Sequence, residues 1–125
     1  MQSNPVIWFE IYVKEMKRAK AFYQAVLQVP LEQLQTPAED VSEMWSFPSQ
    51  MGGAGASGAL VKMDEGPTGN GTIVYFRCDD CAIEASRVES SGGKVMKNKF
   101  SIGQYGFIAL VTDTEGNAIG LHSMK

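Results

Sequence analysis

Hydrophobic and polar positions alternate along residues 6–13, which is typical of a β-strand. One side of this strand is uniformly apolar and consists of Ile7, Phe9, Ile11 and Val13. The other side is aromatic and polar and consists of Val6, Trp8, Glu10 and Tyr12. Because successive side chains of a strand point to opposite faces, we expect the apolar side to pack under a helix. The other side is then expected to line a concave surface.

The pattern changes to helical spacing over Lys14–Gln28, and Pro30 marks the end of the predicted helix. Its expected buried stripe is Met16, Ala19, Tyr23 and Val26. Three short strands are predicted to follow, at Leu31–Gln35, Glu43–Phe47 and Gly58–Met63. Segment 64–71 (DEGPTGNG) reads as a linker, because glycine, proline and acidic residues favour turns.

The same order of elements starts again after this linker. Thr72–Cys78 alternates like a strand, and Asp79 or Asp80 is placed to cap a second helix. The expected buried stripe of that helix is Cys81, Ala85 and Val88, and Gly92-Gly93 ends it. Strands are predicted at Lys94–Asn98, Gly106–Thr112 and Asn117–Met124, with a turn at residues 114–117.

The two halves correspond at one constant offset, which matches Val13 with Cys78, Met16 with Cys81 and Tyr23 with Val88. The predicted fold class is therefore α+β, with two βαβββ modules whose curved mixed sheets form a cup. We predict one domain over residues 1–125, in which module one covers 5–63, the linker 64–71 and module two 72–125.

Composition narrows the kinds of partner. The chain has 125 residues, 44% of them hydrophobic, and a net charge of −3 with Lys and Arg scattered among acidic residues. Nucleic-acid binding usually needs clustered basic residues, so it is not expected. No apolar run is long enough to span a bilayer, and residues 1–13 do not read as a signal peptide. We expect a cytoplasmic protein that binds a small molecule, with no membrane partner.

Two segments carry a family resemblance. Trp8–Tyr23 (WFEIYVKEMKRAKAFY) resembles the opening of the vicinal oxygen chelate superfamily, which includes glyoxalase I, bleomycin-resistance proteins and extradiol dioxygenases. Phe107–His122 (FIALVTDTEGNAIGLH) resembles its final hairpin with an Asp-x-x-Gly turn. The resemblance implies the fold predicted above. It also implies a homodimer, because small members commonly complete their cups by pairing.

The resemblance also locates the positions where metal-dependent members carry His or Glu. Carried over, these positions are Trp8, Ile73 and Gly120, and segment 58–63 holds no His, Asp or Glu. Divalent metals need several converging imidazole or carboxylate donors, and the chain has one histidine. We therefore expect no metal and no other cofactor.

Glu10 and His122 are the candidate catalytic residues. Each lies two residues beyond an expected ligand position, on the same face of its strand. A carboxylate and an imidazole can act as an acid–base pair. The alternative is structural: Glu10 pairs with Arg77 or Lys62, and His122 is a satisfied histidine at a strand end.

The candidate substrate-binding residues are mostly aromatic. Alternation puts Trp8, Tyr12, Tyr75 and Arg77 on the concave side. An apolar wall from Trp45, Phe47, Met51 and Tyr105 is equally well explained as core packing.

Two short motifs have simpler explanations. Residues 53–58 (GAGASG) fit the dinucleotide pattern, but a strand is expected after them where a helix is required, so they are read as a hairpin loop. Cys78 and Cys81 form a C-x-x-C, yet both fall on helix-packing positions and are read as small core residues.

Three functions remain open at this point. The first is a metal-independent small-molecule protein, which either binds an amphipathic ligand or performs acid–base chemistry with Glu10 and His122. The second is a non-catalytic binder that sequesters a cationic drug, as in bleomycin resistance. The third is a metal-dependent lyase or dioxygenase with displaced ligands.

Overall fold

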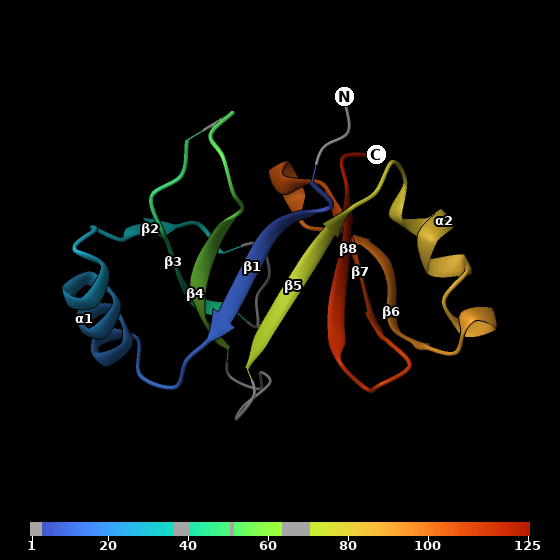
Figure 1. Cartoon of the computed structure of the whole chain (residues 1–125), viewed down its shortest axis with the longest axis horizontal. Helices are drawn as coiled ribbons and strands as arrows, with labels where there is room; N and C mark the ends of the chain where they lie inside the picture. The colour runs from blue at the N-terminus through green and yellow to red at the C-terminus, as the bar shows by residue number, and fades with distance from the viewer. Residues whose placement is uncertain (1–3, 37–40, 51, 64–70) are drawn as a thin grey trace. The chain divides into compact units, whose positions relative to one another are not determined.

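The first alternating segment forms strand β1 (Val6–Tyr12) of a four-stranded arrangement. The structure, a computed structural model, describes residues 4–36, 41–50, 52–63 and 71–125. After β1 come helix α1 (Met16–Leu27) and strands β2 (Glu32–Leu34), β3 (Val41–Ser46) and β4 (Ser57–Met63). Their order across the sheet is β2-β3-β4-β1, with β1 and β4 parallel and the other neighbours antiparallel (Figure 1).

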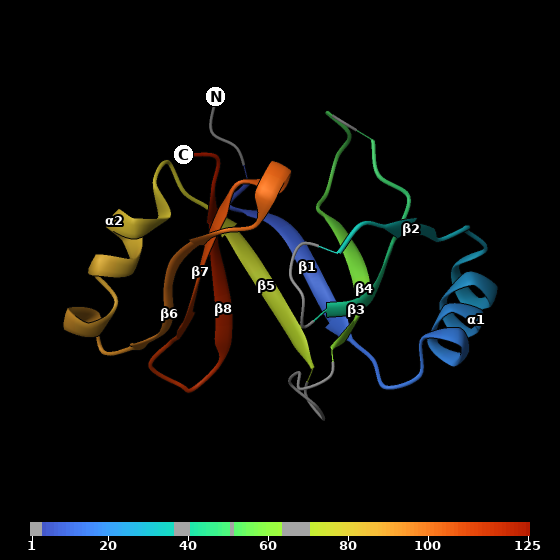
Figure 2. The same ribbon diagram turned by 180° about the vertical axis from the view of Figure 1, so that it is seen from behind.

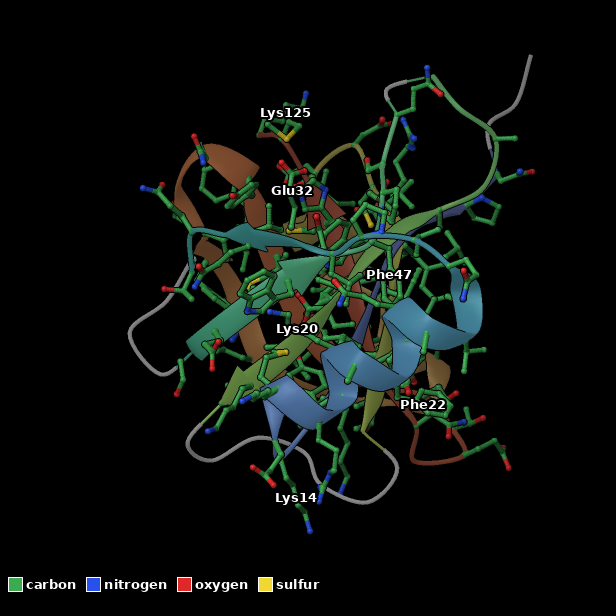
Figure 3. All side chains as sticks on the ribbon, turned by 90° about the vertical axis from the view of Figure 1, so that its left-hand side faces the viewer. Lys14, Lys20, Phe22, Glu32, Phe47 and Lys125 are labelled. Carbon is green, nitrogen blue, oxygen red and sulfur yellow. The ribbon has the colours of Figure 1, made fainter. Side chains whose placement is uncertain are left out.

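Helix α1 covers one face of this first sheet, and Figure 3 shows the helix in front of the strands. Met16, Leu31 and Leu60 are buried there, with Ala19 and Tyr23 packed around them. The predicted position of Val26 in the buried stripe was wrong, because Val26 is 60% exposed. Ten residues beyond Met16, the helix falls about 80° short of completing whole turns, so Val26 lies at the edge of the buried stripe.

The second half repeats the order of elements. Strand β5 (Thr72–Arg77) leads to helix α2 (Cys81–Ser86), the 3₁₀ segment η1 (Glu89–Ser91) and strand β6 (Lys94–Ser101). The short turn η2 (Gly103–Tyr105) and strands β7 (Phe107–Thr112) and β8 (Ala118–Ser123) follow. The strand order is β5-β8-β7-β6, with β5 and β8 parallel and the other neighbours antiparallel (Figure 2).

Asp80 caps α2, since its Oδ1 accepts a hydrogen bond from the Ala82 amide at 3.0 Å. The same carboxylate oxygen lies 2.9 Å from Lys99 Nζ on β6, and these two contacts lower the pKa of Asp80. The helix is shorter than predicted. Ser86 Oγ donates to the Ile83 carbonyl at 2.6 Å, and serine side chains that bond the backbone in this way compete with regular helix.

The core of the second half lies between α2 and its sheet. It consists of Cys78, Cys81, Ala85, Ala109, Val111 and Leu121. Phe76 and Ile119 pack against this cluster from the strands. Among the described residues, each sheet therefore has one face covered by its own α-helix and one face without an α-helix, which is called the helix-free face below.

The α+β class and the repeated strand–helix–strands order are confirmed. By contacts, the described chain divides into two compact units, Trp8–Thr72 and Ile73–Lys125, and the second unit also takes up the chain before Trp8. The predicted linker 64–71 falls, except for Gly71, outside the described residues, as does Met51. Within the described ranges, no helix is long and apolar enough to cross a membrane.

Candidate functional site

Three predicted residues come together on the helix-free face of the first sheet. Glu10 accepts hydrogen bonds from the Trp8 indole Nε1 at 3.1 Å and from the Tyr12 hydroxyl at 2.5 Å. The two donors stand on either side of Glu10 along β1, because alternate residues of a strand share a face. Each donor engages a different carboxylate oxygen. The orientation of the carboxylate is therefore fixed.

An apolar cluster lies next to Glu10 in this sheet. Met44, Ala59 and Val61 are buried beside it, and the rings of Trp8 and Tyr12 pack against this cluster. Strand register puts Ala59 directly opposite Glu10 and Val61 opposite Tyr12. A carboxylate held on an apolar floor can accept a hydrogen bond from a ligand, pair with a ligand cation or take up a proton.

Trp45 and Phe47 lie on the other face of the same sheet, under α1. The Trp45 ring has Lys20 Nζ 3.1 Å from its centroid, and its indole nitrogen donates to Glu43 at 3.1 Å. Phe47 packs with Phe9 and Tyr23, with ring centroids 5.6 Å apart in both pairs. These contacts correspond to the core interpretation of the two residues, so we leave both out of the site proposed below.

The helix-free face of the second sheet carries Tyr75, Arg77 and His122. Arg77 on β5 is the register partner of His122 on β8, and Tyr75 is the partner of Gly120. The His122 Nε2 atom lies 2.6 Å from the carbonyl oxygen of Tyr105. Since a carbonyl only accepts, Nε2 carries the proton of this hydrogen bond. In the neutral ring, Nδ1 is then the basic nitrogen.

The positions of the family's metal ligands do not fit a metal here. Trp8 has only a donor N–H, which points to Glu10, and Ile73 is buried and apolar. At Gly120 the Tyr75 ring occupies the space of a side chain, since a Cβ there would meet Tyr75 Cδ1 at 2.2 Å. The register also identifies the position in β4, which the sequence left open. Tyr75 matches Glu10 at the constant offset, so Ala59 corresponds to Gly120.

Neither Ala59 in β4 nor Gly120 in β8 has a side chain that can bind a metal ion. Among the described ranges, no three His, Cys, Asp or Glu side chains are arranged to hold a metal ion.

Cys78 and Cys81 lie in the core of the second half, which confirms their interpretation as core residues. Burial, reinforced by the nearby Glu84 carboxylate, raises the pKa of the Cys78 thiol to about 11. The thiolate is the reactive form of cysteine, so this environment is the opposite of the one that activates a redox cysteine.

Cys78 is therefore expected to react slowly with iodoacetamide in the folded protein. At a pH below both values, a rise in pKa from 9.0 to about 11 lowers the thiolate fraction about hundredfold. Mass spectrometry of peptides after a timed reaction measures the labelling, and the same reaction in urea is the control. Equal labelling rates in the two conditions would contradict the buried, protonated thiol.

Sequence reasoning missed three features of these faces. The backbone carbonyl of Tyr105 contacts His122. Ile108 lies beside His122 as its register partner on β7, and the Tyr75 ring covers Gly120. Strand pairing creates all three, and the alternation of one strand does not reveal its neighbours. Residues 53–58 (GAGASG) were interpreted as a hairpin loop and not as a dinucleotide site. This was correct, because strand β4, and not a helix, begins there, at Ser57.

Comparison of the sequence with known proteins identifies one superfamily and two related mycobacterial proteins. The sequence profile of the Glyoxalase/Bleomycin resistance protein/Dioxygenase superfamily matches residues 6–121. The chain is 29% identical over 117 residues to CFP32 of Mycobacterium bovis and of Mycobacterium tuberculosis, a protein whose name assigns it provisionally to the glyoxylases. The match covers 91% of this chain and 43% of CFP32, so the chain spans less than half the length of these relatives.

Solved structures share the fold. A hypothetical protein from Bacillus halodurans C-125 superimposes with a TM-score of 0.76 at 15% identity, over 99% of this chain and 96% of that one. Methylmalonyl-CoA epimerase from Mycobacterium tuberculosis gives a TM-score of 0.71 at 16% identity, over 100% of this chain and 93% of that one. At these identities the likeness concerns the fold alone.

Proposed function

Because the chain belongs to the Glyoxalase/Bleomycin resistance protein/Dioxygenase superfamily, we propose that it binds a small molecule, without a metal ion, on its helix-free sheet faces. The observation that carries the proposal is the Glu10 carboxylate, fixed by Trp8 and Tyr12 on an apolar floor. Oriented polar groups on an apolar surface are the usual composition of a ligand site. The ligand is an amphipathic molecule that presents a hydrogen-bond donor or a cation to Glu10.

A catalytic version of this function uses Glu10, or His122, as a general acid or base. Its support is that each group is held in one orientation, by Trp8 and Tyr12 in one case and by the Tyr105 carbonyl in the other. Sequestration of a cationic drug needs the same Glu10 face and no turnover. Substrate turnover in a compound screen distinguishes the two versions.

Metal-dependent chemistry is not part of the proposal. Trp8, Ile73, Gly120 and Ala59 occupy the corresponding positions, and none of these side chains is a metal ligand. A Streptomyces coelicolor methylmalonyl-CoA epimerase has been solved in complex with 2-nitronate-propionyl-CoA, so acyl-CoA thioesters belong among the compounds to be screened.

The proposed assembly is a homodimer. Its support is the exposure of apolar side chains on α1, where Phe22 is 58% and Val26 60% exposed.

Native mass spectrometry of the untagged protein, followed by a thermal-shift screen, tests the proposal. We expect a dimer without stoichiometric zinc, nickel, iron or manganese, and at least one compound class that raises the melting temperature. About one equivalent of metal that survives dialysis would contradict metal independence. A screen in which no compound stabilises the protein, with no small molecule retained in the native spectrum, would contradict the binding function.

A further inference from the structure

Register partners form two rows across the helix-free face of the second sheet. The first row runs from Arg77 through His122 and Ile108 to Phe100. The second row runs from Tyr75 through Gly120 and Leu110 to Lys97. Paired residues of neighbouring strands share a face, so the side chains of these rows project to the side opposite α2. Tyr75 and Ile108 are buried within these rows, whereas Arg77 and Lys97 are exposed and His122 is half-buried.

Arg77 is available for a ligand. Its side chain is exposed, and among the described residues its guanidinium makes no hydrogen bond or salt bridge. Its backbone amide is held separately, by the Pro5 carbonyl at 2.9 Å. Neither row contains Asp or Glu, so no acidic side chain of the rows neutralises this cation.

His122 is positioned to assist Arg77. Adjacent parallel strands put the two side chains side by side, and the Tyr105 carbonyl holds the ring through Nε2. When the imidazole is protonated, Nδ1–H becomes a second donor next to the guanidinium. Lys97 Nζ lies 4.0 Å from the centroid of the Phe100 ring, which keeps a third cation on the same face.

We propose that Arg77 and His122 form a subsite for the anionic group of a small molecule, a carboxylate or a phosphate monoester. This inference rests on the proposed small-molecule function and names the chemical class of the ligand at this face. A guanidinium matches both anions because its paired N–H groups bind two oxygens at once.

The single histidine of the chain makes the test direct, because its imidazole NMR signals belong to one residue. We expect benzoate or phenyl phosphate to shift these signals saturably at millimolar concentration, and the neutral isostere benzamide to leave them in place. Comparing the two anions determines whether carboxylate or phosphate is preferred.

Arg77→Gln is expected to weaken anion binding about tenfold or more, which corresponds to about 1.4 kcal/mol. Arg87→Gln is the matched control, because Arg87 carries the same charge at the exposed end of α2. It is expected to bind like the unchanged protein, whereas a general loss of positive charge would weaken both variants equally. Circular dichroism checks that both variants are folded.

Anions that leave the His122 signals unmoved, or that bind equally well to the Arg77→Gln protein, would overturn the subsite. If neutral or cationic compounds still stabilise the protein in the thermal-shift screen, the small-molecule function survives and only the anion subsite fails. If no compound of any charge binds, the proposed function fails as well.

Discussion

Replacing Gly120 by alanine is expected to lower the free energy of unfolding by about 1–3 kcal/mol, the usual cost of inserting a methyl group into a packed site. The added Cβ would lie 2.2 Å from Tyr75 Cδ1 and 2.4 Å from Tyr75 Cε1, closer than real contacts allow. Gly120 itself is buried in the middle of β8, so the backbone has little room to move away. Urea unfolding, followed by circular dichroism, measures the loss.

Variants of Tyr75 identify the cause of this loss. Tyr75→Phe keeps the ring carbons that meet the new methyl group, so the cost of Gly120→Ala is expected to persist in that background. Tyr75→Ala removes the ring, so the same substitution is expected to cost little there, although Tyr75→Ala is itself destabilising. The difference is a coupling energy between neighbouring residues. An equal cost of Gly120→Ala in all three backgrounds would show that the ring contact is not responsible.

The same packing has a functional consequence. Because Tyr75 covers Gly120, a metal ligand cannot be restored on β8 by one substitution such as Gly120→Glu without displacing the ring. The chain therefore differs from the family's metal-binding members in the packing of β5 against β8 as well as in the ligand residues themselves. We regard Tyr75 as part of the reason that a metal-independent function is the better proposal for this chain.

The sequence predicted the elements well because its signals are local. Alternation along β1 assigned Trp8, Glu10 and Tyr12 to one face, and the structure has Trp8 and Tyr12 donating to Glu10. The sequence offered Asp79 or Asp80 as the cap of α2, and the structure selects Asp80. Caps and alternation involve residues a few positions apart, so one stretch of sequence contains the whole signal.

The sequence was less informative where the outcome depends on strand pairing. Trp45 and Phe47 were candidates for either a ligand wall or the core, because an aromatic side chain suits both environments. Only the pairing of Trp45 with Leu60 assigns Trp45 to the α1 face, since Leu60 is fully buried under that helix. Lys62 likewise faces the side opposite Glu10, because it pairs with Glu43 and follows Ala59 by three positions. That register removes Lys62 as the structural partner considered for Glu10.

Glu43 provides a matched control for the function of Glu10. Each carboxylate accepts a hydrogen bond of 3.1 Å from a tryptophan indole two residues away in the same strand. Glu10 lies on the helix-free face with its apolar floor, whereas Trp45, the partner of Glu43, packs under α1. The same substitution at the two positions therefore changes the same chemistry in two environments.

Glu10→Gln is expected to reduce ligand affinity tenfold or more, about 1.4 kcal/mol, for the compound that most stabilises the protein in the thermal-shift screen. Glutamine keeps the shape and one acceptor oxygen, which can still receive the Trp8 N–H, while its amide donates to the Tyr12 oxygen. The fold is therefore expected to persist, with the loss confined to the negative charge presented to the ligand. Glu43→Gln is expected to leave the affinity unchanged.

Melting temperature and ligand affinity together distinguish function from structure. If Glu10 is only structural, Glu10→Gln lowers the melting temperature and leaves the affinity as in the Glu43→Gln control. His122→Asn is tested in the same way, as a second single variant. Unchanged affinity in both single variants would remove the two residues from the site.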